Sequence, residues 1–204
     1  MQYWNDLITE KSWKLLQKLN KEIDFILIGG WAAYLWTHAQ KSKDIDIVIG
    51  FEELEKIKTE YDLKKNDRLR KYEIIVDEVD VDIYVPFYSK LSIPIEELEN
   101  YVSKIEGFKV VDAEILLLLK QGAEKARGHS EKGMKDRVDI MQLLLKTKIN
   151  FGKYSELTEK FELGDFRKRL ILIVNSFREH EYLDLNLREL KKKKQELLQK
   201  IKSK

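Results

Sequence analysis

Residues 23–49, IDFILIGGWAAYLWTHAQKSKDIDIVI, decide how this chain folds. A β-rich run over 23–28 ends at a glycine pair, and the alanine-containing segment 31–36 then has the composition of a helix. The segment 44–49 alternates acidic and apolar residues and then becomes wholly apolar, as expected of a strand that is polar only at its start. The order strand, glycine turn, helix and strand predicts a sheet whose first two strands are joined through a helix.

The flanking sequence extends this sheet. Apolar residues at helical spacing predict a helix over 5–19, ahead of the first strand. Two β-type runs, 72–76 and 79–85, are separated by two acidic turn residues, which predicts a hairpin. Further predicted elements are helices over 52–60 and 96–104 and a strand over 108–111.

The rest of the chain has helical patterns only. The predicted helices cover 113–126, 136–147, 154–161, 165–178 and 187 to the end, with a glycine- and charge-rich loop at 127–135. The sequence therefore predicts an α+β fold with a mixed sheet flanked by helices in residues 1–111, followed by a helical bundle in residues 112–204. The lysine-rich final helix keeps apolar residues near helical spacing, which favours an amphipathic helix packed on the body over a nucleic-acid arm.

Composition excludes several classes of site. The net charge of +2 gives no uniformly basic field of the kind that by itself indicates nucleic-acid binding. Cysteine is absent, so thiolate metal sites, cysteine nucleophiles and disulfides are excluded together. No apolar run approaches the roughly 20 residues that span a bilayer, and the N-terminus has acidic residues where a signal peptide is basic and then apolar. We therefore expect a cytoplasmic protein that does not bind membranes.

Acidic residues are placed to gather on one face of the sheet. Side chains two residues apart on a strand share a face, so Asp44 and Asp46 point the same way, as do Asp80 and Asp82. If the two strands are neighbours, they lie about 4.8 Å apart and bring three carboxylates together. Such a cluster repels itself, and two divalent cations would relieve the repulsion, with Mg²⁺ the natural choice for oxygen ligands. Alternatively, these aspartates form the exposed face of an edge strand.

The order of these motifs resembles that of the DNA polymerase β-like nucleotidyltransferase superfamily. Its parts here are Ile28-Gly29-Gly30-Trp31, thirteen residues from Trp31 through Lys43, then Asp44-Ile45-Asp46-Ile47, and later Val81-Asp82-Ile83. The resemblance covers roughly residues 20–86, and its motifs are short but agree in order and in strand context. It implies a nucleotidyltransferase-fold sheet and a metal-dependent transfer of a nucleoside monophosphate from a nucleoside triphosphate (NTP).

The resemblance also implies roles for individual residues. Gly29 and Gly30 would hold the nucleotide phosphates through backbone amides at the start of the helix. Asp44 and Asp46 would bind two Mg²⁺ ions, and Asp82 would be the third carboxylate, as a metal ligand or general base. Asp80 is the alternative third carboxylate because it lies on the same strand, nearer the acidic turn.

Two positions beside these motifs bear on phosphate binding. The family often has serine after the second glycine, where this chain has Trp31, so a side-chain contact to phosphate at that position is not implied. Lys43, just before the acidic pair, is a candidate phosphate contact, although lysines at such positions are more often solvated.

The helical half carries a second likeness. Lys120, Arg127 and the run 135–140 (KDRVDI) resemble the pattern that follows the catalytic domain in AbiEii-type, toxin-like minimal nucleotidyltransferases. That pattern implies that a basic residue reaches back toward the nucleotide, and Lys135 is the candidate. An equally weighted interpretation is structural, with Asp136 capping the helix and Asp139 pairing with a neighbouring base.

Three functions remain open from sequence. The first is a nucleotidyltransferase (EC 2.7.7-type) that releases pyrophosphate and whose acceptor is a tRNA or other nucleic acid, a protein, or a small molecule such as an aminoglycoside; the toxin-like branch would imply an antitoxin partner. The second is a non-catalytic nucleotide- or RNA-binding protein of the same fold. The third is a structural protein whose acidic strands keep a sheet edge soluble.

Overall fold

The computed structural model describes residues 2–128 and 130–203. The chain divides into two compact units, Met1–Asp112 and Ala113–Lys204.

The first unit is built on one mixed seven-stranded sheet, in the order β3-β4-β5-β2-β1-β7-β6. The two central strands β2 and β5 are parallel, whereas β2 pairs with β1 in the antiparallel sense. The strands are β1 (Ile26–Ile28), β2 (Ile45–Val48), β3 (Lys64–Asn66), β4 (Lys71–Val76), β5 (Val79–Tyr84), β6 (Val102–Ile105) and β7 (Phe108–Val111).

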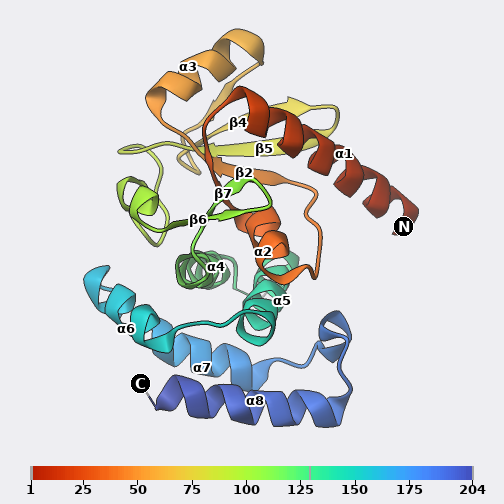
Figure 1. The fold of residues 1–204 in the computed structure, drawn as a ribbon, viewed down its shortest axis with the longest axis vertical. Helices are drawn as coiled ribbons and strands as arrows, with labels where there is room; N and C mark the ends of the chain where they lie inside the picture. Colours follow the sequence, from red (N-terminus) through yellow and green to blue (C-terminus); the bar gives the residue numbers. More distant parts are fainter. Residues whose placement is uncertain (1, 129, 204) are drawn as a thin grey trace. The chain divides into compact units, whose positions relative to one another are not determined.

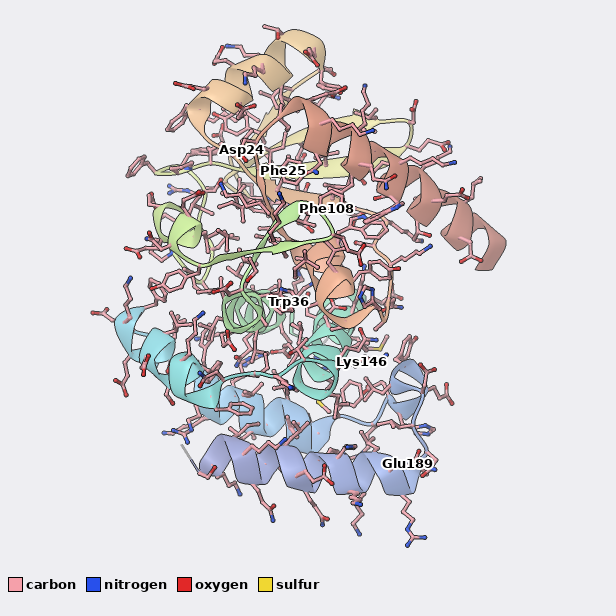
Figure 2. The ribbon with its side chains drawn as sticks, in the orientation of Figure 1. Asp24, Phe25, Trp36, Phe108, Lys146 and Glu189 are labelled. Carbon is pink, nitrogen blue, oxygen red and sulfur yellow. The ribbon has the colours of Figure 1, made fainter. Side chains whose placement is uncertain are left out.

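Helices cover the apolar face of this sheet. They are α1 (Gln2–Glu22), α2 (Gly29–Thr37) and α3 (Phe51–Glu60). Figure 1 shows α1 lying along the sheet beside β5. Its buried Leu16 and Leu19 point into the core, and the Trp13 ring lies 5.0 Å from that of Trp31 and 5.5 Å from that of Phe108. Phe108 is labelled in Figure 2 among the side chains that fill this layer. One face of the sheet is thus apolar and covered by helices of its own unit.

The hairpin predicted from the sequence is present. Strand β4 pairs with β5 in the antiparallel sense from Tyr72↔Ile83 to Val76↔Val79. Its two turn residues, Asp77 and Glu78, both have positive φ, 50° and 71°. Such turns match the twist of a hairpin, and this one fixes the register of β4 on β5.

The helix predicted over 96–104 is wrong from residue 102 onward, where the chain forms a strand. The first part of this segment is a short 3-10 helix, η1 (Ile95–Asn100), and strand β6 follows it. Strand β6 pairs with β7 through a turn at Glu106 and Gly107. Both turn residues have positive φ, 49° and 86°, so this is a second tight hairpin whose ladder hydrogen bonds outweigh local helix propensity. The three-residue strand β3 was not predicted either, because its sequence KKN has no apolar alternation.

The second unit is helical. Its elements are α4 (Ala113–Arg127), α5 (Glu131–Lys146), α6 (Phe151–Lys160), α7 (Phe166–Ser176), η2 (His180–Leu183) and α8 (Leu187–Lys202). Figure 1 shows α7 and α8 side by side, and α8 begins at a capping box of Asn186 and Glu189, the latter labelled in Figure 2. Helix α5 begins five residues before its predicted start, because the Ser130 side chain accepts a hydrogen bond from the backbone N–H of Gly133.

Within residues 2–128 and 130–203, no helix is long and apolar enough to cross a membrane.

Candidate functional site

A row of acidic residues crosses three neighbouring strands of the first unit. Asp46 on β2 lies directly opposite Asp82 on β5, and Asp82 lies directly opposite Glu73 on β4. On the other side, Asp46 lies opposite Ile28, the last residue before the two glycines. Because side chains opposite each other in a sheet share a face, the three carboxylates stand side by side on the face opposite the apolar layer.

The remaining predicted carboxylates lie around this row. Asp44 lies in a bend one residue before β2, the strand that carries Asp46 on the acidic face, and it is half-buried. Asp80 also shares that face, but it is exposed and lies opposite the exposed Ile75. Asp82, with 22% of its side chain exposed, is therefore the carboxylate of this strand that directly adjoins Asp46.

The ammonium group of Lys71 contacts two carboxylates of the row. Lys71 Nζ lies 2.5 Å from Asp82 Oδ2 and 3.0 Å from Glu73 Oε1, and Asn66 Nδ2 donates to the same Glu73 oxygen at 2.9 Å. Burial and the neighbouring Asp46 charge raise the pKa of Asp82 to about 6, against the opposing effect of Lys71. Lys71 lowers the pKa of Glu73 by hydrogen bonding to its charged form. The row therefore carries more negative charge than its one ammonium balances.

The carboxylates of the row have the chemistry to bind a divalent cation, but their side chains are not gathered around a common point. Asp46 and Asp82 are hard oxygen ligands side by side, and burial together with the Asp46 charge raises the pKa of Asp82, so a cation would stabilise its charged form. As the side chains stand, no three carboxylate or imidazole groups in the described part of the chain gather closely enough to hold a metal ion. Instead, Lys71 occupies one oxygen of Asp82.

Two glycines hold the start of α2 against β2. Gly29 has φ of +70°, and a Cβ built there would lie 2.5 Å from Asp46 Cγ, so only glycine fits. A Cβ on Gly30 would lie 2.8 Å from Ser42 Cβ and collide with its hydroxyl oxygen. The N-cap residue Ile28 supplies no side-chain hydrogen bond to the first helical amides. The positive end of the α2 dipole therefore lies against Asp46 with its first amides uncapped by side chains.

The other residues singled out near this helix differ in their environment. Trp31 is completely buried, and its Nε1 donates a hydrogen bond to Ser12 Oγ at 2.8 Å. Its side chain is therefore part of the core. Lys43 is exposed and makes no ion pair with any described residue.

The residues singled out in the helical half form an ion-pair network within the second unit. Lys120 Nζ lies 2.6 Å from Asp139 Oδ2 and 3.6 Å from Asp136 Oδ1, and Arg127 Nη1 lies 3.3 Å from Asp136 Oδ2. Both aspartates are 2% exposed. The expected pairing of Asp139 with a base is confirmed, whereas Asp136 does not cap α5, since that helix begins at Glu131. Lys135 is half-buried on α5 and makes no ion pair within the described ranges.

Sequence reasoning missed three residues of the first unit. Lys71 and Glu73 could have been found, because a two-residue turn at Asp77 and Glu78 places Glu73 opposite Asp82 by counting along the hairpin. Ser42 gave no signal, because its contact with Gly30 depends on how the loop before β2 folds back on the helix.

Comparison with known proteins identifies the fold. No protein-family model matches the sequence, and no curated protein matches it. Among solved structures, a candidate nucleotidyltransferase from H. pylori is similar with a TM-score of 0.55 and 18% identity, over 97% of this chain and 96% of that one. The structure of JHP933 from Helicobacter pylori is similar at the same TM-score and identity, over 96% of this chain and 94% of that one. The predicted fold class, a nucleotidyltransferase-like mixed sheet flanked by helices and followed by a helical region, is confirmed.

Proposed function

We propose that this protein is a metal-dependent nucleotidyltransferase that moves a nucleoside monophosphate from an NTP to an acceptor hydroxyl and releases pyrophosphate. One observation carries the proposal: the adjacent pair Asp46 and Asp82 stands beside the glycine-built start of α2. This places carboxylates for cations next to amides for phosphate, which are the two needs of a bound Mg²⁺-triphosphate. The fold shared with the candidate nucleotidyltransferase from H. pylori supports it.

The proposed chemistry assigns a task to each group. Asp44, Asp46 and Asp82 would hold two Mg²⁺ ions, which supply positive charge to the triphosphate and to the attacking oxygen. The first amides of α2 bind phosphate oxygens. Asp82, beside Asp46, would also take part in removing the proton of the acceptor hydroxyl. The new bond joins the acceptor oxygen to the α-phosphorus, and the bond from that phosphorus to the pyrophosphate oxygen breaks.

A second candidate function has an observation of its own. The contact of Lys71 with Asp82, together with the absence of a three-ligand cluster among the described residues, favours a protein of this fold that binds nucleotides without transferring them. In that case the ammonium of Lys71 stands permanently where a cation would otherwise share Asp82.

Binding and transfer are tested separately. We would titrate each of the four Mg²⁺-NTPs into the wild type by calorimetry, beside an Asp44→Asn, Asp46→Asn double variant and the control Asp62→Asn, which changes an exposed carboxylate of the same unit. The proposal requires metal-dependent binding in the wild type and the control, and its loss in the double variant. Binding that survives the double variant would place the nucleotide elsewhere.

Transfer is then followed with NTPs labelled on the α-phosphate, using the protein itself, bulk tRNA and an aminoglycoside as acceptors. Label retained by one acceptor with the wild type but not with the double variant supports the enzyme. Binding without transfer to any acceptor favours the non-catalytic candidate.

A further inference from the structure

We propose that the hydroxyl of Ser42 is a phosphate ligand of the NTP site, acting together with the first amides of α2. This inference rests on the proposed function. It assigns one further residue, and one further contact to the triphosphate, to the same site.

The burial of Ser42 is the first observation. The loop 41–43 alternates, with Lys41 and Lys43 exposed and Ser42 only 3% exposed between them. A short polar side chain is thus turned inward while two long basic ones remain in solvent. The Ser42 hydroxyl is not one of the fully buried side-chain oxygens that lack a hydrogen bond in the described residues, so it keeps contact with solvent and stays open to a ligand.

No hydrogen bond of Ser42 Oγ is formed with any residue of 2–128 or 130–203. Other buried serines of the same unit do have partners: Ser12 Oγ accepts from Trp31 Nε1 at 2.8 Å, and Ser89 Oγ accepts from the Val85 N–H at 3.0 Å. Ser42 therefore differs from these two serines, whose hydroxyls are held by protein groups.

The direction in which Ser42 points is the second observation. Its Cβ would lie 2.8 Å from a Cβ on Gly30, and its oxygen would be nearer still. Gly30 is the second residue of α2, whose first amides have no side-chain cap. The hydroxyl is therefore presented at the helix N-terminus, where backbone N–H groups and the helix dipole favour an anion. A hydroxyl can donate to a phosphate oxygen beside those amides.

The position also explains why both glycines are needed. Gly29 lies against Asp46, a proposed cation ligand, and Gly30 lies against Ser42. One end of the triphosphate would thus meet amides and a hydroxyl, while the cations that accompany it meet Asp46. Trp31, which belongs to the core, cannot supply this contact.

The test compares two buried serines. Calorimetry would measure the affinity of the wild type, Ser42→Ala and Ser89→Ala for Mg²⁺-ATP, for Mg²⁺ with inorganic triphosphate, and for adenosine. A hydrogen bond to a charged group predicts that Ser42→Ala weakens both phosphate ligands by about tenfold or more, and by the same factor. Its melting temperature should hardly change, because no protein hydrogen bond is lost. Ser89→Ala should behave in the opposite way, with a lower melting temperature and unchanged affinity.

Other outcomes overturn the proposal in distinct ways. Equal affinities for wild type and Ser42→Ala, with the wild type binding Mg²⁺-ATP, overturn the role of Ser42 and leave the proposed function standing. A loss confined to Mg²⁺-ATP, with inorganic triphosphate unaffected, also contradicts a phosphate contact. No binding of any phosphate ligand by the wild type overturns both. Should Ser42→Ala fail to fold, Ser42→Cys keeps nearly the same shape with a weak donor, and it must show the same loss.

Discussion

The two units of this protein treat their buried carboxylates in opposite ways. In the second unit, Asp136, Asp139 and Glu124 are at most 4% exposed, and each contacts Lys120 or an arginine. In the first unit, Asp46 and Asp82 are only half-buried, they stand directly opposite each other, and one lysine contacts Asp82.

We interpret this difference as that between a structural network and the proposed binding site. Buried carboxylates that each contact a lysine or arginine hold helices together, and removing one partner leaves a buried charge uncompensated. A row of carboxylates that remains under-neutralised costs stability in the folded state, and a cation can recover that cost on binding. Lys120 and Arg127 of the second unit contact Asp136 and Asp139, whereas in the first unit Asp82 contacts Lys71 and also lies opposite the like charge of Asp46.

The largest expected effect comes from breaking the network of the second unit. Lys120→Met removes the ammonium between Asp136 and Asp139 and leaves them poorly compensated in a buried site. We expect a loss of about 3–5 kcal/mol in the free energy of unfolding, measured by urea denaturation at neutral pH. Lys125→Met, which breaks the exposed pair with Asp165, is the control and should cost less than about 1 kcal/mol. Equal effects of the two substitutions would contradict a structural network.

The pH dependence of the free energy of unfolding should show how much the Asp82 charge destabilises the first unit. The pKa of Asp82 is raised to about 6 in the folded protein, so the folded state binds this proton more tightly than the unfolded state does. Stability contributed by the protonated carboxyl is therefore present below about pH 4 and is lost as the pH rises through about 6. Without divalent cations, wild type should lose on the order of 2 kcal/mol relative to Asp82→Asn between these limits. Parallel curves of unfolding free energy against pH for the two proteins would show that the Asp82 charge does not destabilise the folded state.

Relief of repulsion within the row should be visible in a single substitution. Asp46→Asn removes one of the two opposed charges, and we expect the metal-free variant to be as stable as wild type or more stable, by about 1 kcal/mol. Thermal unfolding in EDTA measures this change. Added Mn²⁺ should raise the melting temperature of wild type more than that of the variant. A clear destabilisation in EDTA would indicate that Asp46 is structural, like Asp139.

The smallest effect is expected at an ordinary surface pair. Lys14→Ala breaks an exposed contact of 3.2 Å with Glu10 on α1, and the free energy of unfolding should change by less than about 0.5 kcal/mol. Urea denaturation of this variant sets the scale against which the changes at Lys120 and Asp82 are judged. A change as large as that of Lys120→Met would mean that burial does not distinguish the two kinds of pair.

The sequence predicted those parts of the fold whose pattern repeats. The apolar alternation predicted strands β2 and β5, and the acidic two-residue turn predicted the hairpin of β4 and β5. That Asp46 lies opposite Asp82 depended on β2 and β5 being neighbours, which the sequence left open and the structure shows. Strand β6 was missed because Glu106 and Gly107 form a hairpin turn inside a segment of helical composition. The contacts of Ser42 with Gly30 and of Lys71 with Asp82 join residues far apart in the chain, and only packing determines them.

The central claim is that the acidic row and the start of α2 form one site for a metal-bound triphosphate. The most direct test is a crystal structure with Mn²⁺ and a non-hydrolysable NTP, in which anomalous scattering locates the metal. The account predicts Mn²⁺ bound by Asp46 and Asp82, phosphates on the amides of Gly29 and Gly30, and the Ser42 hydroxyl on a phosphate oxygen. Nucleotide bound elsewhere, or an acidic row without metal and with Lys71 still on Asp82 at saturating Mn²⁺, would contradict it.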